Sequence, residues 1–417
     1  MQIQLRYGNS SIPLEFDPER FTVIGGNSDA AGLSDAELGA KLEQPIGSPA
    51  LEDIVKAGES VLFVVPDATR ETACGQVINL VVRRLIANGT SPAEINIIFA
   101  TGVHRPVTDD EKQKILTPFI AQRIRTLEHD AEDKRRMYRL GETRGGIPVE
   151  LNWALTEFDH VILIGGVSFH YFAGFTGGRK LICPGLASVK TISETHRLAF
   201  DCERRDRRAG VGPGKLDGNP VHEAFIEAAS LAKTSFAINT IVNDAGNATD
   251  LFCGDLEASH RAACKAYAAH HTIRIPERRR IVIASCGGAP HDVNMIQAHK
   301  TLDAATHACE EGGTIILIAE CPEGLGRKDF LQWFDAPSAE ELARTLCNAY
   351  QVNGQTAWSL LKKAERFDVR LISRLDAASA EKMKLTPMQS LARALSKVPG
   401  DLPGYIIPSG SRYIFES

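Results

Sequence analysis

Short apolar segments that alternate with predicted helices are the feature that most constrains the fold of this chain. The segments Val61–Val65, Ile95–Ala100 and His160–Gly165 have the length and composition of buried strands. The residues between them predict helices over about 72–88 and 108–117. Strands that alternate with helices favour a parallel sheet covered on both faces. The sequence therefore predicts an α/β fold.

The same alternation resumes after Pro276–Arg280, where a run of charged residues predicts a domain boundary. Strands are predicted at 281–284, 314–318 and around Tyr405, and helices at about 294–309, 338–350 and 355–365. A chain of 417 residues is also too long for one ordinary core. We therefore expect two α/β domains, residues 1–272 and residues 273–417, each with a largely parallel sheet flanked by helices.

The charge balance and the cysteine pattern argue against several classes of protein. Lys and Arg number 47 against 52 Asp and Glu, a net charge of -5, which disfavours nucleic-acid binding. The apolar runs are too short to span a bilayer, and the first residues lack the apolar core of a signal peptide. The nine cysteines form no C-x-x-C pair, so we expect free thiols rather than a zinc site or a disulfide framework. A cytoplasmic protein that binds neither nucleic acid nor membranes is the expectation.

Polar side chains follow each of the first three predicted strands. The first strand leads into residues 67–70 (Asp-Ala-Thr-Arg), the second leads to His104 and the third leads to His170. Because ligands bind outside the carboxyl ends of parallel strands, we expect these side chains to form one site. In the second domain, Gln297 and Lys300 are three residues apart and share a helix face. The pattern predicts an active site in the inter-domain cleft, suited to a small anion and to proton transfer by histidine.

The segment from His170 to Gly185 reads His-Tyr-Phe-Ala-Gly-Phe-Thr-Gly-Gly-Arg-Lys-Leu-Ile-Cys-Pro-Gly. Its glycines let the backbone approach a bound group closely, and Lys180 is suited to anchor a phosphate or to act as an amine nucleophile. The segment is not a P-loop, because Arg179 precedes the lysine and Leu181 follows it. Taken singly, the Asp-x-Thr-Arg stretch suits a helix N-cap and the histidines suit ordinary polar contacts. The prediction of a site therefore depends on their occurrence at consecutive strand ends.

Together these residues resemble the lactate racemase family, whose members carry a nickel-pincer nucleotide. The resemblance is carried by residues 67–70, Thr101–Pro106, the 170–185 segment, His196 and the Asp292–Lys300 stretch. It implies an isomerase, namely a racemase or C2 epimerase of a 2-hydroxy carboxylic acid. It also implies an N-terminal cofactor-binding domain, a C-terminal domain that contributes substrate contacts, and separate enzymes that supply the cofactor.

The resemblance further implies a role for each site residue. Lys180 matches the lysine bonded covalently to the cofactor, nickel(II) pyridinium bis-thiocarboxylic acid mononucleotide, and His196 matches the histidine that ligates the nickel. Cofactor contacts match Asp67, Ala68, Thr69 and Arg70; substrate contacts match Arg70, Gln297 and Lys300; the catalytic acid–base pair matches His104 and His170. Inversion at C2 would then proceed by proton-coupled hydride transfer to and from the cofactor, through a 2-oxo acid intermediate.

Two other classes of function stay open. A zinc-dependent hydrolase or lyase would use His104, His170 and His196, although the chain has no H-E-x-x-H motif. A non-catalytic protein of the same fold would bind a nucleotide or another anion.

Within the family, the substrate is also open. Ile296 stands where lactate-type members are expected to carry an aromatic residue, which disfavours lactate itself. We hypothesise that His299 and Arg105 serve a larger or more polar substrate.

Overall fold

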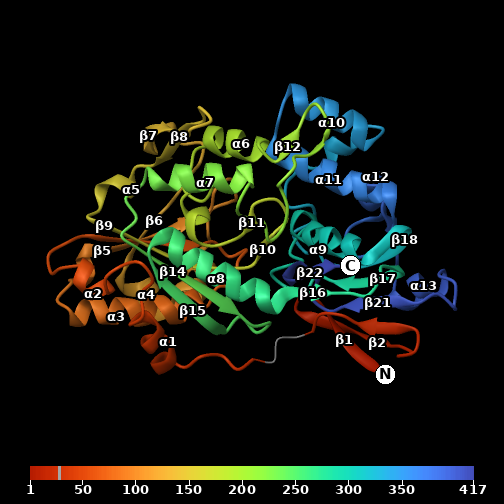
Figure 1. Cartoon of the computed structure of the whole chain (residues 1–417), viewed down its shortest axis with the longest axis horizontal. Coiled ribbons are helices and arrows are strands. Elements are labelled where there is room, and N and C mark those ends of the chain that lie inside the picture. Colours follow the sequence, from red (N-terminus) through yellow and green to blue (C-terminus); the bar gives the residue numbers. More distant parts are fainter. Residues whose placement is uncertain (27–29) are drawn as a thin grey trace. The chain divides into compact units, whose positions relative to one another are not determined.

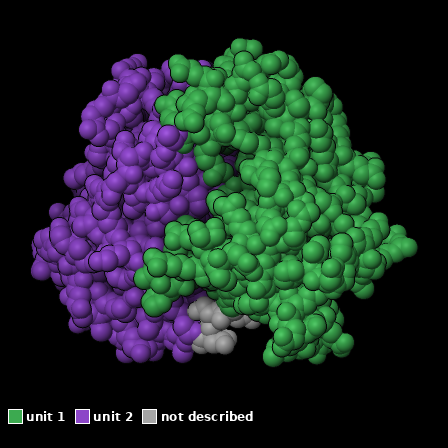
Figure 2. Space-filling model, turned by 45° about the vertical axis from the view of Figure 1, so that its right-hand side comes forward, with its two compact units in different colours: residues 1–27, 200–208, 269–417 green, residues 28–199, 209–268 purple. Residues whose placement is uncertain are grey.

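The computed structural model describes residues 1–26 and 30–417, and the chain divides into two compact units. Unit 1 comprises Met1–Asn27, Phe200–Arg208 and Ala269–Ser417, and unit 2 comprises Ser28–Ala199 and Ala209–Ala268 (Figure 2). Each unit is thus built from segments that are distant in the sequence. The predicted division into a cofactor-binding domain of residues 1–272 and a domain of residues 273–417 that contributes substrate contacts stays a prediction.

Unit 2 is built around a six-stranded sheet in the order β15-β14-β9-β4-β5-β6. Figure 1 labels five of these strands, all except β4. All neighbouring strands are parallel except β14 and β15, which form an antiparallel edge. The strands are β4 (Val61–Pro66), β5 (Ile95–Ala100), β6 (Arg125–Leu127), β9 (His160–Gly166), β14 (Phe236–Val242) and β15 (Ala248–Gly254). The three strands predicted from the sequence are β4, β5 and β9, which lie side by side in the sheet.

Helices and irregular segments cover both faces of this sheet. Val77 and Val81 of α3 share a hydrophobic core with Phe63 of β4 and Ile162 of β9. Side chains alternate between the two faces of a strand, so position 165 belongs to the face opposite to that of Ile162. On that face Leu181 of the 3-10 helix η3 (Gly178–Leu181) packs against Gly165. The helices are α1 (Asp35–Leu42), α2 (Leu51–Ile54), α3 (Cys74–Ala87), α4 (Asp109–Arg123), α5 (Ala154–Glu157), α6 (Val189–Arg197), α7 (Pro220–Ser230) and α8 (Leu256–His271).

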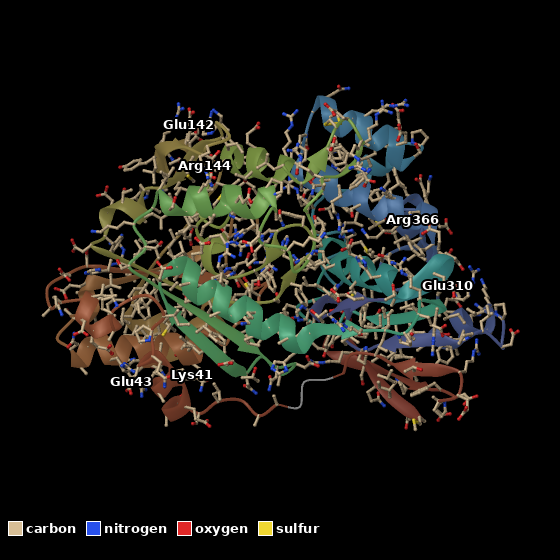
Figure 3. All side chains as sticks on the ribbon, viewed as in Figure 1. Lys41, Glu43, Glu142, Arg144, Glu310 and Arg366 are labelled. Atoms are coloured by element: carbon tan, nitrogen blue, oxygen red, sulfur yellow. A yellow bond between two sulfur atoms is a disulfide. The ribbon has the colours of Figure 1, made fainter. Side chains whose placement is uncertain are left out.

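A hairpin of β7 (Met137–Glu142) and β8 (Pro148–Asn152) adds a small antiparallel sheet to unit 2. Arg144 lies in its turn, near Glu142 (Figure 3), and its guanidinium pairs with Glu227 of α7 at 2.5 Å. The backbone N–H of Arg144 donates to the same carboxylate at 2.9 Å. These bonds tie the hairpin turn to α7.

Unit 1 contains a second six-stranded sheet, all parallel, in the order β20-β19-β18-β17-β21-β3. The strands are β3 (Phe21–Val23), β17 (Arg279–Ser285), β18 (Cys309–Ile318), β19 (Asp368–Ile372), β20 (Thr386–Pro387) and β21 (Gly404–Ile407). The helices are α9 (Met295–Ala308), α10 (Ala339–Asn348), α11 (Val352–Arg366), α12 (Ala377–Lys382) and α13 (Leu391–Ser396). Short pairs are formed by β1 (Gln2–Tyr7) with β2 (Ser10–Glu15), by β12 (Phe200–Asp201) with β13 (Asp206–Arg207), and by β16 (Thr272–Arg274) with β22 (Ile414–Glu416). The predicted fold class, α/β with two largely parallel sheets flanked by helices, is confirmed.

The cysteines require a correction. Cys202, between β12 and β13, forms a disulfide with Cys347 of α10, so the prediction of free thiols throughout was wrong for this pair. The two cysteines are 145 residues apart, and no local spacing in the sequence indicates the pairing. The other seven cysteines are free and buried. Among the described helices, none combines the length and apolar character needed to cross a membrane.

Candidate active site

The strand order of unit 2 brings three of the predicted loops to one edge of the sheet. β9, β4 and β5 are consecutive, parallel neighbours, so their carboxyl ends lie together. Asp67 directly follows β4, His104 follows β5 after a short turn, and His170 follows β9. The sequence could predict this arrangement because each strand is a separate buried run with polar residues at its end.

Asp67 and His104 are in direct contact. The carboxylate Oδ2 of Asp67 lies 2.6 Å from Nδ1 of His104, and its Oδ1 accepts hydrogen bonds from the hydroxyl (2.6 Å) and the N–H (3.1 Å) of Thr69. Burial by itself would raise the pKa of the Asp67 carboxyl. The hydrogen bond and charge of His104, with smaller contributions from Arg70 and Thr69, outweigh it and hold this pKa well below its usual range. Asp67 is therefore an ionised, buried hydrogen-bond acceptor.

The rest of the 67–70 stretch is half-buried at the same strand end. Ala68, Thr69 and Arg70 all keep part of their surface exposed, and the N–H of Arg70 donates to the Asp67 carbonyl at 3.2 Å. Burial lowers the pKa of the Arg70 guanidinium, although the charge of Asp67 opposes this. An arginine stays protonated under such a shift, so Arg70 offers a positive charge beside the dyad of Asp67 and His104.

The glycine-rich segment folds into a small hairpin followed by a 3-10 turn. β10 (Phe169–His170) pairs with β11 (Gly174–Phe175), and η3 then carries Lys180. Gly174 has φ +79°, and a Cβ there would lie 2.1 Å from the carbonyl oxygen of Lys215. Only glycine fits this backbone without displacing the neighbouring loop. The glycines therefore shape the turn that ends at Lys180.

Lys180 and His196 both lie near the rings of Phe172 and Phe225, and His170 lies near Phe172. The ammonium of Lys180 lies 5.6 Å from the ring centre of Phe172 and 5.1 Å from that of Phe225. The imidazole of His196 lies 5.1 Å and 5.4 Å from the same two rings, and that of His170 lies 4.5 Å from Phe172. Sequence reasoning missed both phenylalanines, because Phe172 looked like part of the turn and Phe225 is in the distant helix α7.

His196, near the end of α6, is held as a neutral imidazole. Its Nδ1 lies 2.7 Å from the carbonyl oxygen of Ile192, so this nitrogen carries the proton. Burial, and then the charge of Lys180, lower the pKa of His196 to about 3, against a smaller opposing effect of the Ile192 carbonyl. The Nε2 lone pair is therefore available near neutral pH, which is the form in which histidine ligates metals.

Arg179, the residue before Lys180, is directed into the interior of unit 2. Its side chain is fully buried, and it donates to the carbonyl oxygen of Ala173 (2.8 Å) and contacts Nε2 of His260 in α8 (2.9 Å). Burial lowers the pKa of Arg179 to about 10. The side chain stabilises the turn through these buried contacts. The sequence does not predict this structural role, because Arg179 is adjacent to Lys180 in the same motif.

The predicted substrate residues of unit 1 are neighbours on α9. Nζ of Lys300 donates to Oε1 of Gln297 at 2.5 Å, as their spacing predicts. His299 is fully buried, with Nε2 3.2 Å from Ser359 Oγ, so its side chain is part of the core rather than of a surface. Arg105 is exposed and pairs with Glu111 at 2.7 Å.

Metal ligands are sparse in the protein itself. Within residues 1–26 and 30–417, no group of three or more His, Cys, Asp or Glu side chains is arranged to hold a metal ion. His196 offers a single nitrogen. A metal bound there needs its remaining donors from another molecule, which fits a cofactor that brings its own sulfur and carbon donors.

Two known protein domains match parts of the chain. Residues 7–207 match the lactate racemase N-terminal domain, and residues 276–401 match the lactate racemase C-terminal domain. The chain belongs to the lactate racemase family.

Individual relatives support the assignment. The chain is 30% identical over 336 residues to the lactate racemase of Thermoanaerobacterium thermosaccharolyticum, covering 80% of this chain and 77% of that one. It is 32% identical over 333 residues to the lactate racemase of Lactiplantibacillus plantarum, covering 79% and 77%. The solved lactate racemase apoprotein from T. thermosaccharolyticum superposes with a TM-score of 0.90 over the whole of both chains, at 27% identity. A Thermotoga maritima protein shares the fold, with a TM-score of 0.73 at 20% identity over 94% of this chain and 99% of that one.

Proposed function

We propose that this protein is a racemase or C2 epimerase of a 2-hydroxy carboxylic acid and that it works on a nickel-pincer nucleotide bonded to Lys180. Membership of the lactate racemase family supports the reaction class. The observation that carries the proposal is that Lys180 and His196 contact the same two aromatic rings, those of Phe172 and Phe225. A covalent anchor and a nickel ligand for one cofactor have to be close together, and these two side chains are.

The residues present fit the cofactor. The neutral imidazole of His196 provides one nitrogen ligand and Lys180 provides the amine for attachment. Asp67, Ala68, Thr69 and Arg70 follow the carboxyl end of β4, where we expect them to contact the cofactor. When bound, the cofactor supplies an acceptor and donor of hydride. The protein then has to supply proton transfer and to hold a planar acid.

The acid–base work falls to the two histidines. Nε2 of His104 takes the C2 hydroxyl proton from one enantiomer, and His170 exchanges the proton with the other, so the substrate hydroxyl meets one imidazole in each orientation. Arg70 pairs with the substrate carboxylate, and Gln297 and Lys300 remain proposed substrate contacts from unit 1. The placement of these groups around one cleft stays a prediction.

The decisive test is to produce the protein together with enzymes that make the pincer cofactor and to measure its intact mass and bound metal. We expect one adduct on Lys180 and about one nickel per chain. The matched controls are Lys180→Ala, which should lose the adduct, and His196→Ala, which should keep the adduct and lose nickel. No adduct and no nickel, where a known family member is loaded in parallel, would reject the proposal.

The substrate is then found by a screen. Loaded protein is incubated with single enantiomers of 2-hydroxy acids of increasing size and polarity, and chirality at C2 is followed by chiral chromatography. Inversion of any acid in the panel supports the proposal. Zinc in place of nickel, with hydrolysis or elimination instead of inversion, would favour the metal-dependent hydrolase or lyase.

A further inference from the structure

The two histidines of the proposed acid–base pair differ in what their Nδ1 atoms face. Nδ1 of His104 lies 2.6 Å from a carboxylate oxygen of Asp67. Nδ1 of His170 instead accepts a hydrogen bond from the backbone N–H of Ala173, at 3.3 Å. A ring nitrogen that faces an acceptor carries a proton, and one that faces a donor carries a lone pair. In the neutral form of each ring, Nδ1 of His104 therefore carries the proton and leaves the lone pair on Nε2, whereas Nδ1 of His170 carries the lone pair.

The carboxylate that faces His104 is itself fixed. Asp67 is buried, and its other oxygen accepts two hydrogen bonds from Thr69, one from the hydroxyl and one from the N–H. These bonds leave Oδ2 directed at His104 and set the plane of the carboxylate. The imidazole of His104 is 41% exposed, so this contact is the main constraint on a ring that is otherwise open to ligand.

We propose that Asp67 is a positioning residue for His104, and that it acts on the reaction by fixing the Nδ1–H tautomer and leaving Nε2 to receive the substrate hydroxyl proton. This inference rests on the proposed function and deepens it. The proton passes from the hydroxyl oxygen to Nε2, and the imidazolium that results is stabilised by the carboxylate across the ring. The family resemblance implies a cofactor contact for Asp67, and the structure shows its carboxylate in contact with His104.

The structure indicates which substitution separates the two roles. In Asp67→Asn, the Thr69 N–H and hydroxyl still require an acceptor, so the amide oxygen takes the place of Oδ1 and the amide NH2 faces His104. That donor forces the lone pair onto Nδ1 and the proton onto Nε2. His104 then presents a donor where the reaction needs an acceptor, while the size of the side chain is unchanged.

The first measurement is the tautomer of His104 in cofactor-free protein. Two-bond 1H–15N correlation spectra of protein labelled at histidine distinguish the tautomers, and His104→Gln assigns the signal. We expect a protonated Nδ1 in the wild type and a switch to Nε2–H in Asp67→Asn. Asp67→Ala provides a second variant, in which the fixed tautomer is lost rather than reversed.

The second measurement uses loaded enzyme. We expect Asp67→Asn to lower the racemisation rate by about 10⁴-fold, the size of effect found when the orienting carboxylate of a catalytic His–Asp pair is replaced by its amide. The adduct on Lys180, the nickel content and the melting temperature should stay as in the wild type. The matched control is Glu59→Gln, because Glu59 makes a similar 2.7 Å contact to Nε2 of His160 at the opposite end of β9; it should leave the rate unchanged.

Three results would overturn the inference: a wild-type His104 with its proton on Nε2, an Asp67→Asn rate within tenfold of wild type, or loss of the adduct in Asp67→Asn. Loss of the adduct would indicate that Asp67 contributes to cofactor binding rather than to the position of His104. The spectra are recorded without cofactor, so failure of the proposed function, seen as wild-type protein that takes up no adduct, is read separately from failure of this assignment.

Discussion

The proposed division of labour in unit 2 predicts that chemistry and cofactor binding can be separated one residue at a time. Replacing His104 or His170 with Gln removes a group that exchanges protons near neutral pH, so we expect racemisation to fall by at least about 10²-fold. Nickel and adduct should remain, because His196 and Lys180 hold them. Chiral chromatography, metal analysis and intact mass make the comparison, with His160→Gln as the control. Loss of nickel in both variants would contradict the assignment.

At the scale of residues, the sequence identifies the reactive side chains but not the apolar residues that pack against them. His104, His170 and Lys180 stand out because each is a reactive type next to a strand end or a glycine turn. Phe172 and Phe225 are ordinary apolar residues until the fold places them under Lys180 and His196. No local sequence pattern predicts the contact of Phe225 with Lys180 and His196, because these residues are distant in the chain.

At the scale of elements, the packing of α8 against η3 predicts a strict requirement for glycine at position 178. Gly178 has φ +47°, and a Cβ there would lie 2.9 Å from the ring of His260. Gly178→Ala should therefore cost more than the roughly 1 kcal/mol of an unfavourable φ alone, and it should reduce loading of the neighbouring Lys180. Gly246→Ala is the control, because Gly246 has φ +77° with open space around it. Urea unfolding and intact mass test this; equal effects of the two variants would contradict it.

A second prediction concerns the link between α9 and α11 in unit 1. Asp303 of α9 lies 2.8 Å from Lys363 of α11 and 2.9 Å from Arg207, all largely removed from solvent. Burial would raise the pKa of Asp303, but the charges of Lys363 and Arg207 outweigh it and hold the pKa well below its usual range. Asp303→Asn leaves two cations facing an amide, and we expect a loss of about 3 kcal/mol in the free energy of unfolding at pH 7.

The pH dependence of this link has a defined sign. The folded pKa of Asp303 is below the unfolded value of about 4, so its stabilisation is complete above that value and is lost as the pH falls below it. Wild type and Asp303→Asn should therefore converge in stability on acidification below about pH 4. Urea unfolding at a series of pH values measures the gap; a gap that widens in acid would show the sign to be wrong.

Helices and strands were predictable where the signal for them lies within the segment itself. β4, β5 and α9 were predicted to within a few residues, because an apolar run of five or six residues, or a helical period, is a local signal. β14 was missed even though all seven of its residues are buried, since its run Phe-Ala-Ile-Asn-Thr-Ile-Val is interrupted by polar residues. Asn239 in that run accepts a hydrogen bond from the N–H of Gly178 at 3.0 Å, a tertiary role that breaks the apolar pattern.

At the scale of the whole molecule, the alternation of strands and helices predicted two parallel sheets, but not the path of the chain between them. After its N-terminal part, the chain belongs to unit 2 up to Ala199, re-enters unit 1 for Phe200–Arg208, goes back to unit 2 and returns to unit 1 at Ala269. A segment of nine residues with only two-residue strands has too little periodicity to reveal such an excursion. What holds it in unit 1 is tertiary: the ion pair of Arg207 with Asp303, and the disulfide of Cys202 with Cys347.

That disulfide yields a prediction for the chain as a whole. It links residues 145 apart, and the loop it closes contains the whole 209–268 segment of unit 2. Closing a loop of that length is worth about 5 kcal/mol in the chain-entropy model, because it restricts the unfolded chain. Reduction should therefore lower the urea midpoint of the wild type, while the double variant Cys202→Ser with Cys347→Ser should unfold at the reduced midpoint with or without reductant. Thiol titration of denatured protein gives the check: seven thiols before reduction and nine after it support the bond, whereas nine in both cases, with no shift in midpoint, would show that residues 200–208 are held in unit 1 by packing and ion pairs alone.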